Sequence, residues 1–313
     1  MNSVVRKSDD RTVHLPVLLR EVIDRLDLRP GLTVVDGTVG GGGHSRAIWE
    51  LIGPTGRLLG LDRDPAMLVR ARQTLTGTPL DDRLVLRQGS YCRMEQILQQ
   101  LNWPTVDCVL VDLGLSSDQL ADPQRGFGFQ TQGQLDLRFD TGAGESAAQL
   151  LSRMSVEELT HLLQTVGEEP HARAIAERVA DEQRRGRPVE TVQQLVDVVW
   201  QARYPKSAAP PFSAVRSGPH PATQTFQALR IAVNQELEHL KQLLERVLPA
   251  CLSPGGRAAV ITFHSLEDRL VKEAFRKAET WDSLTRKPIA PSPTEVRLNP
   301  RCRSAKLRVA VRK

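Results

Sequence analysis

A glycine-rich loop and three aspartates are the parts of this chain whose residue types and spacing could hold a charged ligand. Asp36 is followed by seven residues of which five are glycine, in the string DGTVGGGGHS at positions 36–45. Asp62 and Asp112 end two later apolar runs. Glycines leave backbone N–H groups open to a ligand, and an acid at the end of the second strand of a Rossmann-type half-site accepts ribose hydroxyls. The spacing predicts a site for an adenosine-containing ligand.

The loop by itself leaves three interpretations open. S-adenosylmethionine is favoured, because it carries a sulfonium and an ammonium that carboxylates stabilise and has no phosphate. A nucleotide cofactor is the second, although Asp36 stands where a pyrophosphate would pass. A purely structural glycine turn is the third. A P-loop is disfavoured because no lysine precedes Ser45.

Asp112 is the candidate for chemistry on a bound substrate. It ends the run VDCVLVD at 106–112 and opens the polar loop LGLSSDQL, at the edge of the sheet where ligands of such folds bind. An acid there could accept a hydrogen bond from a target amine and help to remove its proton. The alternative is that Asp112 caps the next helix or binds the backbone of the loop. Ser116 and Ser117 are weaker candidates, since serines in such turns usually bond the backbone.

Two histidines are further candidates for contact with a substrate. His220 lies between two prolines in SGPHPATQTF, where a stiff backbone could present its side chain to a substrate or serve structure alone. His264 lies beside Ser265 in TFHSLEDR. A hydrolase is disfavoured there, because no G-x-S-x-G elbow precedes the serine and adjacent residues do not form a triad. A hydrogen-bonded strand end is the preferred interpretation of His264.

These candidates need a sheet to position them, and the chain contains six short runs typical of strands. They cover Leu32–Asp36, Arg57–Asp62, Arg83–Gln88, Val106–Asp112, Arg257–Phe263 and Leu307–Val311. The first four are separated by helix-length segments, which predicts a parallel sheet with crossover helices.

Between the fourth and fifth runs the pattern becomes helical. Ser155–Glu158 is a capping box that opens a helix ending at Gly167, 172–185 is a charged helix, and Thr191 opens a third. We therefore expect residues 1–129 and 214–313 to form one discontinuous α/β domain. Residues 130–213 would be an inserted all-helical subdomain for substrate recognition, and a single long helix, 225–248, would return the chain to the sheet.

Composition narrows the class of protein. The 313 residues are 40% hydrophobic and 25% charged, which is ordinary for a globular chain of one or two domains. The four cysteines are far apart, with no CxxC pair, so neither a disulfide framework nor a zinc site is expected. The first residues contain no apolar leader segment and no run is long enough to span a membrane. We expect a cytoplasmic protein without a membrane segment.

Positive charge is concentrated near the C-terminus, which favours an anionic partner. The net charge is +5, and the seven cations from residue 297 onward have no acidic neighbour among them: Arg297, Arg301, Arg303, Lys306, Arg308, Arg312 and Lys313. We expect Arg301, Arg303 and Lys306 to contact nucleic-acid phosphates. The alternative is a solvated basic tail, although the alternation in AKLRVAVR is typical of a strand.

Nine strings, in order along the whole chain, resemble one family, the bacterial small-subunit ribosomal RNA (cytosine-N4)-methyltransferases of the MraW/RsmH type. They are HLPVLLREV (14–22), VDGTVGGGGHS (35–45), GLDRDP (60–65), VDLGLSSDQL (111–120), RGFGF (125–129), LDLRFD (135–140), HPATQTFQALRIAVNQEL (220–237), TFHSLEDR (262–269) and NPRCRSAKLR (299–308).

The resemblance implies a Rossmann-like class I methyltransferase with a helical insertion. It implies S-adenosylmethionine as cofactor, 16S ribosomal RNA within a small ribosomal subunit as partner, N4 of a decoding-centre cytosine as acceptor, and no metal. A second copy of the chain is a further candidate partner. The implied cofactor residues join Asp36 and Asp112 as follows: Gly42, Gly43, His44, Asp62, Tyr91 and Gln119. For the substrate side, we expect Ser116, Ser117 and His220 to act together with Arg301, Arg303 and Lys306.

Two positions depart from the family pattern, and two other classes of protein stay open. Tyr91 stands where many relatives have phenylalanine, and Gln224 where an arginine is usual. A nucleotide-dependent oxidoreductase is disfavoured by Asp36. A catalytically idle assembly factor is disfavoured by the intact loop and the acids at 36, 62 and 112.

Overall fold

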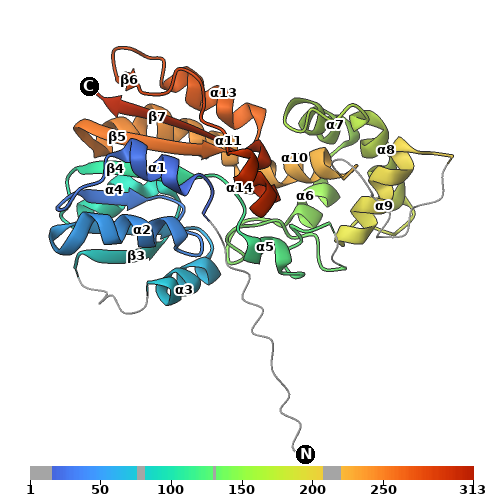
Figure 1. The fold of residues 1–313 in the computed structure, drawn as a ribbon. Helices are drawn as coiled ribbons and strands as arrows, with labels where there is room; N and C mark the ends of the chain where they lie inside the picture. The colour runs from blue at the N-terminus through green and yellow to red at the C-terminus, as the bar shows by residue number, and fades with distance from the viewer. Residues whose placement is uncertain (1–15, 76–81, 130–131, 207–219) are drawn as a thin grey trace, which may run out of the picture.

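The computed structural model describes residues 16–75, 82–129, 132–206 and 220–313 (Figure 1). The expected limits of the insertion, Gln130 and Ser213, fall outside the described residues, as do the first fifteen residues. Within the described part of the chain, no helix combines the length and the apolar character needed to cross a bilayer.

A seven-stranded sheet organises the first part of the molecule and the C-terminal part. Its strands, in the spatial order β3-β2-β1-β4-β5-β7-β6, are β1 Thr33–Asp36, β2 Arg57–Asp62, β3 Leu84–Gln88, β4 Val106–Asp112, β5 Leu252–Thr262, β6 Trp281–Ser283 and β7 Lys306–Arg312. The strands β1 to β5 are parallel, whereas β7 pairs antiparallel with both β5 and β6. The order reverses at β1, so β1 and β4 meet at a topological switch point.

The six predicted strands are confirmed, and two details differ. The strand β5 begins at Leu252, five residues before the predicted start, because its first part pairs with Val106 through a shift in register. The strand β6 has three residues, too few for an alternating pattern to be seen in sequence.

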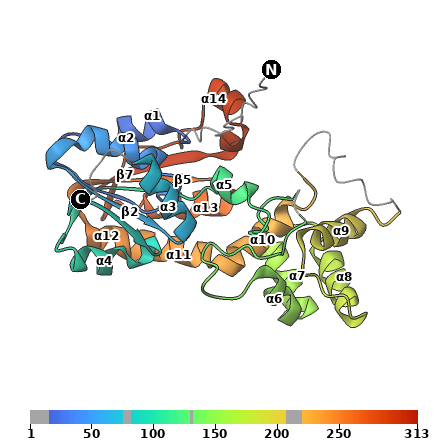
Figure 2. The same cartoon turned by 90° about the horizontal axis from the view of Figure 1, so that it is seen from below.

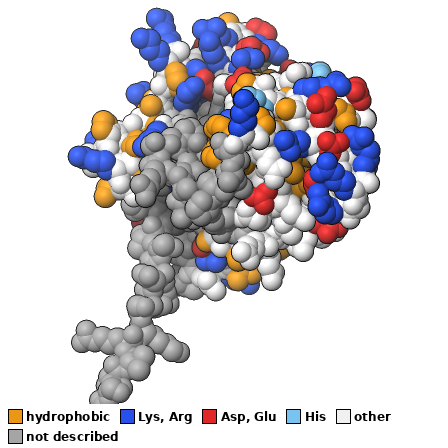
Figure 3. Space-filling model, turned by 90° about the vertical axis from the view of Figure 1, so that its right-hand side faces the viewer, with side chains coloured by type: hydrophobic (Ala, Val, Ile, Leu, Met, Phe, Trp, Pro, Cys, Tyr) orange, Lys and Arg blue, Asp and Glu red, His pale blue; other side chains and the backbone are white. Residues whose placement is uncertain are grey.

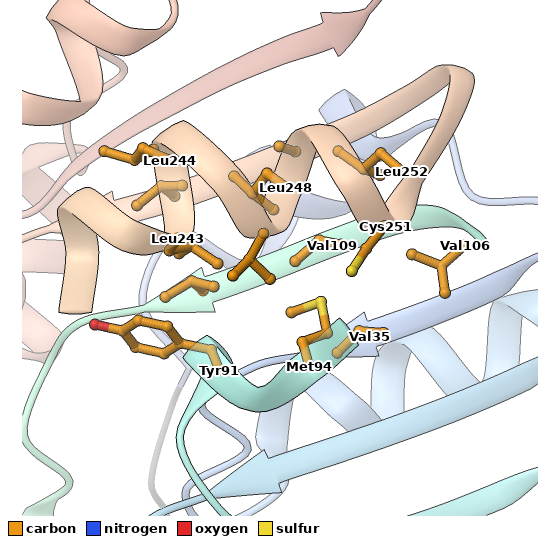
Figure 4. Packing of buried hydrophobic residues seen from close by; sticks show 14 of the residues in the cluster. Val35, Tyr91, Met94, Val106, Val109, Leu243, Leu244, Leu248, Cys251 and Leu252 are labelled. Carbon is orange, nitrogen blue, oxygen red and sulfur yellow. The ribbon is translucent and has the colours of Figure 1, made fainter. Parts of the chain in front are cut away.

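Alternation along the strands puts helices on both faces of the sheet. Val34 faces a core built with α1 Leu19–Leu26 and α2 Gly43–Ile52, and the helix α3 Pro65–Thr74 lies on β2 and β3. Val35 faces the opposite core, built with α4 Met94–Gln100, α11 Glu236–Gln242, α12 Leu248–Cys251 and α13 Ser265–Ala274 (Figure 4).

A separate hydrophobic core lies in the helical part of the molecule, which we call the helical subdomain. Its helices are α6 Ala147–Arg153, α7 Val156–Thr165, α8 Ala172–Arg184, α9 Val192–Arg203 and α10 Thr223–Asn234. Figures 1 and 2 show these helices side by side at one end of the molecule, away from the sheet. Phe127 before them and Phe226 within α10 belong to this core.

The predicted helices at 155–167, 172–185 and 191 onward are confirmed, with capping boxes at Ser155 and Thr191. The first ends at Thr165, and the left-handed residue that follows is Glu168, with φ of 51°.

The single long helix predicted over 225–248 is wrong. The helix α10 stops at Asn234, and Gln235 adopts a left-handed conformation with φ of 52° before α11 starts. A π-helical turn, Leu243–Val247, then separates α11 from α12. The cause of the break is tertiary, because the amide of buried Asn234 accepts from Phe139 N at 2.8 Å and donates to the Leu137 carbonyl at 2.7 Å. Hydrophobic periodicity continues through such a break.

Candidate active site

A cavity opens at the carboxyl edge of the sheet, over the ends of β1, β2, β4 and β5. The glycine loop after β1 forms one wall, and the loop from Leu113 to Ser117 forms another. The start of α11 and the segment from Asn299 to Arg301 complete the lining. This is the switch point where ligands of doubly wound sheets bind.

The glycine loop is tied to the next strand through Asp62. Gly40 has φ of 51°, and its backbone N donates to Asp62 Oδ2 at 2.9 Å. At Gly41 a Cβ atom would meet nothing within 4 Å, although Gly41 lines the cavity. The free space beside Gly41 is therefore space that a ligand can occupy, with bare backbone next to it.

Gly42 and Gly43 have packing roles as well. Gly42 has φ of +85°, and a Cβ there would lie 3.1 Å from Ala71 Cα on α3. A Cβ at Gly43 would lie 2.5 Å from Pro16 Cγ. Only Gly43 of these two lines the cavity.

Asp36 lies beneath the loop and does not line the cavity. It is 1% exposed, and its Oδ2 accepts from the Ser45 hydroxyl at 2.7 Å while its Oδ1 accepts from Thr38 N at 3.2 Å. Burial raises the pKa of Asp36, and the nearby His44 opposes that shift. The geometry gives Asp36 the task of holding the loop in shape.

His44 and Asp112 face each other across the cavity floor. His44 Nε2 lies 2.9 Å from the Val17 carbonyl oxygen, and its Nδ1 lies 3.9 Å from Asp112 Oδ2. Asp112 Oδ1 accepts from Gly114 N at 3.1 Å. The Asp112 side chain keeps 18% of its surface exposed and lines the cavity.

Burial makes ionisation of the Asp62 carboxyl group unfavourable. Burial raises its pKa to about 7, although backbone N–H groups of Asp64 and Gly40 oppose the shift. Its Oδ1 accepts from Asp64 N at 2.9 Å. A ligand that donates hydroxyl hydrogens to this carboxylate would relieve the cost of ionising it.

Gln119, Ser116 and Ser117 line the far wall, at the start of α5 Ser117–Ala121. The Gln119 side chain is fixed at both ends, because its Nε2 donates to Asp64 Oδ2 at 3.0 Å and its Oε1 accepts from Ser116 N. Ser116 caps the helix by accepting from Gln119 N. Arg125 also donates to Asp64 at 2.6 Å, so this wall is rigid.

Tyr91 lies at the inner side of the cavity, next to the start of α11. Its ring packs among the core residues and its hydroxyl points out of that cluster (Figure 4). Burial raises the pKa of Tyr91, and Cys92, Glu236 and Glu267 contribute in the same direction. The hydroxyl therefore stays protonated and can donate a hydrogen bond.

The remaining predicted site residues divide into two groups. Arg301 lines the cavity from the 3-10 helix Pro300–Ser304. Arg303 is exposed on the same turn and does not line the cavity, and Lys306 donates to Asp268 Oδ2 at 3.4 Å. His220 lies in the helical subdomain, where its ring stacks on Phe129 with centroids 4.6 Å apart. The structure does not bring His220 into the cavity.

Several lining residues were missed by the sequence analysis. Glu236 forms a two-pronged ion pair with Arg230, at 2.8 and 2.9 Å. Glu267 Oε2 accepts a hydrogen bond from Phe263 N at 2.8 Å. Arg63 makes a cation–π contact with Phe139, with the guanidinium Cζ 5.7 Å from the ring centroid. Phe139 lies in the quoted string LDLRFD, which was the one signal that could have found it.

The prediction that His264 is a hydrogen-bonded residue at the end of a strand is confirmed. Its Nδ1 accepts from Glu267 N, which caps α13. The four cysteines are buried free thiols. Within the described ranges, no three His, Cys, Asp or Glu side chains group as metal ligands would.

The residues present fit S-adenosylmethionine. Gly41 offers open space beside bare backbone, Asp62 offers a buried carboxylate for ribose hydroxyls, and the carboxylates of Asp112 and Glu236 line a cavity suited to a sulfonium and an ammonium. The described lining has no lysine next to the glycine loop that would bind a phosphate. Fold and site together define a Rossmann-like, S-adenosylmethionine-dependent methyltransferase with a helical insertion.

The chain belongs to the MraW methylase family, whose sequence model matches residues 11–313. Three curated relatives are each described as a ribosomal RNA small subunit methyltransferase H. The protein from Solidesulfovibrio magneticus is 44% identical over 97% of this chain and 97% of its own length. The proteins from Thermomicrobium roseum and Trichlorobacter lovleyi are 46% and 45% identical, over 96% and 95% of this chain and 94% and 97% of their own lengths.

Proposed function

We propose that this protein transfers the methyl group of S-adenosylmethionine to N4 of one cytosine in the decoding centre of 16S ribosomal RNA. The observation that carries the proposal is the cavity at the switch point, where the glycine loop, Asp62 and Asp112 meet in a chain that the MraW methylase model matches nearly end to end. The relatives' description as small-subunit methyltransferases supports the choice of RNA.

In this proposal the glycine loop and Asp62 hold the cofactor. Gly41 and Gly43 present backbone to the methionine part, Asp62 accepts the ribose hydroxyls, and the rigid wall made by Gln119 and Leu115 borders the adenine, with Tyr91 on the inner side. When bound, S-adenosylmethionine supplies an electrophilic methyl group on a sulfur that is already a good leaving group. The protein's main contribution is then to align two reactants, which can be worth effective molarities of about 10⁵–10⁸ M.

Asp112 is proposed to act on the target amine. The lone pair of cytosine N4 is conjugated with the ring, so an acceptor on one of its N–H bonds localises that lone pair for attack. Asp112 Oδ1 accepts from Gly114 N at 3.1 Å, and the carboxylate lines the cavity in which the amine would bind. After transfer, the same carboxylate takes the excess proton.

The substrate side of the cavity requires an unstacked base. A cytosine in a helix cannot reach the end of β4, so we infer that the target nucleotide is flipped into the cavity. Ser116, Ser117 and Arg301 line its mouth, and Arg303 and Lys306 are proposed to contact backbone phosphates beyond it. His220 is proposed to contact RNA outside the cavity, beside the helical subdomain, where its ring stacks on Phe129.

The wider setting is also part of the proposal. We place the reaction in the cytoplasm, on RNA within a small ribosomal subunit, and we propose a second copy of the chain as partner. The net charge of +5 supports an anionic partner such as RNA.

The test is a methyl-transfer assay with identification of the product. The purified protein is incubated with labelled S-adenosylmethionine and small subunits that lack the modification, and digested nucleosides are identified by mass. N4-methylcytidine at a single position is the expected result. Cofactor binding without transfer to either subunits or free 16S RNA would contradict the proposed activity, and no cofactor binding would contradict the interpretation of the glycine loop.

A further inference from the structure

A second cavity lies between the sheet domain and the helical subdomain. One wall comes from the loop after β3, at Gly89 and Ser90, and from α11 and the π-helical turn. The other wall comes from Arg138 to Gly144 and from the end of α10. Figure 2 shows α11 between the two parts of the molecule, with the chain leading to α6 passing beside it.

This second cavity is rich in cations. Four arginines line it, namely Arg63, Arg93, Arg138 and Arg246, against the acids Glu95 and Asp140. Arg138 is neutralised by Asp136 at 2.7 Å. Arg246 approaches Glu95 only to 3.8 Å and is 60% exposed. Positive charge in the cavity is therefore only partly compensated.

Two of these arginines have no acidic partner among the residues that the structure describes. Arg93 donates only to the neutral amide of Gln96, at 3.4 and 3.3 Å. Arg63 donates to the Asn234 carbonyl at 2.7 Å and lies 3.3 Å from His239 Nδ1. Arg93 is exposed, whereas Arg63 is half-buried. A half-buried guanidinium without a counter-charge is costly, and an anion beside it reduces that cost.

The arginines of the helical subdomain provide a contrast. Arg173 pairs with Glu177 at 2.7 Å, and Arg185 and Arg187 both pair with Glu182, at 3.2 and 2.8 Å. Figure 3 shows basic and acidic side chains mixed over that end of the molecule. Unlike these three arginines, Arg63 and Arg93 of the second cavity have no carboxylate partner in the part of the chain that the structure describes.

Arg63 lines both cavities, so the second cavity adjoins the active site. A flipped nucleotide in the active site has to be joined to its neighbours through phosphodiester groups. A guanidinium binds such a phosphate with charge-assisted hydrogen bonds. The arginines of the second cavity, next to the active-site cavity, are therefore complementary in charge to the phosphates of that strand.

We propose that the second cavity binds the backbone phosphates of the single-stranded RNA adjoining the target base, through Arg63, Arg93 and Arg246. The identity of the polymer rests on the proposed function. The second cavity is separate from the C-terminal basic residues, and it gives the RNA a path between the two parts of the molecule.

The test measures RNA binding against salt, without requiring methyl transfer. The double variant Arg93→Ala/Arg246→Ala is compared with wild type on a short single-stranded RNA containing one cytosine. The control is Arg72→Ala/Arg87→Ala, which removes two exposed arginines that line neither cavity. Each lost phosphate contact should lower the slope of log K against log salt by about 0.7, so the double variant should lose up to about 1.4.

Two further measurements test the proposal. S-adenosylhomocysteine should bind the double variant as tightly as wild type, and an RNA with neutral methylphosphonate linkages should bind wild type weakly. An unchanged salt slope, an equal effect in the control, or no binding of the RNA by wild type would overturn the proposal. If methyl transfer occurs but the double variant keeps the wild-type salt slope, the proposed function is supported and the phosphate-binding role of the second cavity is contradicted. If the salt slope changes but no transfer occurs, the phosphate-binding role is supported and the proposed function is contradicted.

Discussion

At the scale of single residues, the site combines acids that burial has made reluctant to ionise. Asp36 and Asp62 both have a raised pKa because of burial, yet only Asp62 lines the cavity. Asp36 keeps its partners Ser45 and Thr38 within the protein, whereas Asp62 and Asp112 line the cavity. Residues of the same type at equivalent strand ends therefore have different tasks.

Asp62 predicts a pH dependence of cofactor binding. Its pKa in the unliganded protein is about 7, and ribose hydroxyls bind the ionised form, so affinity should rise as pH rises through 7. From pH 8 to pH 6 the dissociation constant of S-adenosylhomocysteine should increase roughly tenfold. Calorimetric titration at several pH values measures this.

The matched variant is Asp62→Asn, which should bind weakly and with a flatter pH profile. Ionisation of the ligand itself affects both proteins equally and cancels in the comparison. Parallel pH profiles for wild type and variant would refute the role given to the Asp62 carboxylate.

Asp112 predicts a loss of turnover that exceeds the loss of binding. Asp112→Asn keeps an oxygen for Gly114 N but cannot take a proton, so methyl transfer should slow by roughly 10²–10⁴-fold. Single-turnover transfer and S-adenosylhomocysteine affinity are measured together. Unchanged transfer would remove Asp112 from the chemistry, and an equal fall in affinity would reduce it to a cofactor ligand.

At the scale of elements, the loop between β1 and α2 has two kinds of glycine. Gly43 is required by packing, since a Cβ would lie 2.5 Å from Pro16 Cγ, whereas at Gly41 it would meet nothing within 4 Å. Packing requires glycine at position 43, whose backbone also lines the cavity, whereas at Gly41 the missing side chain leaves space for the ligand.

Alanine substitutions should separate these two roles. Gly43→Ala should lower the free energy of unfolding by roughly 1–3 kcal/mol through overpacking. Gly41→Ala should change it by less than about 0.5 kcal/mol while weakening S-adenosylhomocysteine binding, because the methyl group enters the cavity. Denaturant unfolding of the unliganded variants and ligand titration check both; equal stability of the two variants would contradict the assignment.

At the scale of the whole molecule, two hydrophobic parts meet at the junction of α10 and α11. The sheet domain and the helical subdomain each have their own core, and Asn234 bonds to both Leu137 and Phe139. Its carbonyl also accepts from Arg63 at the end of β2. The break in the helix at Gln235 thus fixes how the two parts are joined.

Asn234→Ala should destabilise this junction. It leaves the Leu137 carbonyl and the Phe139 N–H without their partner, which costs roughly 2–4 kcal/mol of unfolding free energy. Lys241→Ala, exposed on α11, is the control and should change stability by less than about 0.5 kcal/mol. Chemical denaturation measures both, and an Asn234 variant as stable as the control would show that the side chain does not join the two parts.

The sequence by itself determined the parallel strands, the helical block, the glycine loop and the acids at strand ends, because these depend on periodicity and on the local chemistry of adjacent residues. Tertiary structure alone decided that Asp36 lies under the loop, that His220 stands apart from the cavity, that α10 breaks at Gln235, and that Glu236, Phe139 and Arg63 reach the site. Each of these depends on contacts between residues far apart in the chain, such as Asn234 with Leu137, 97 positions away. Such contacts have no signature in local spacing, since burial and hydrogen-bond partners arise only when the elements pack.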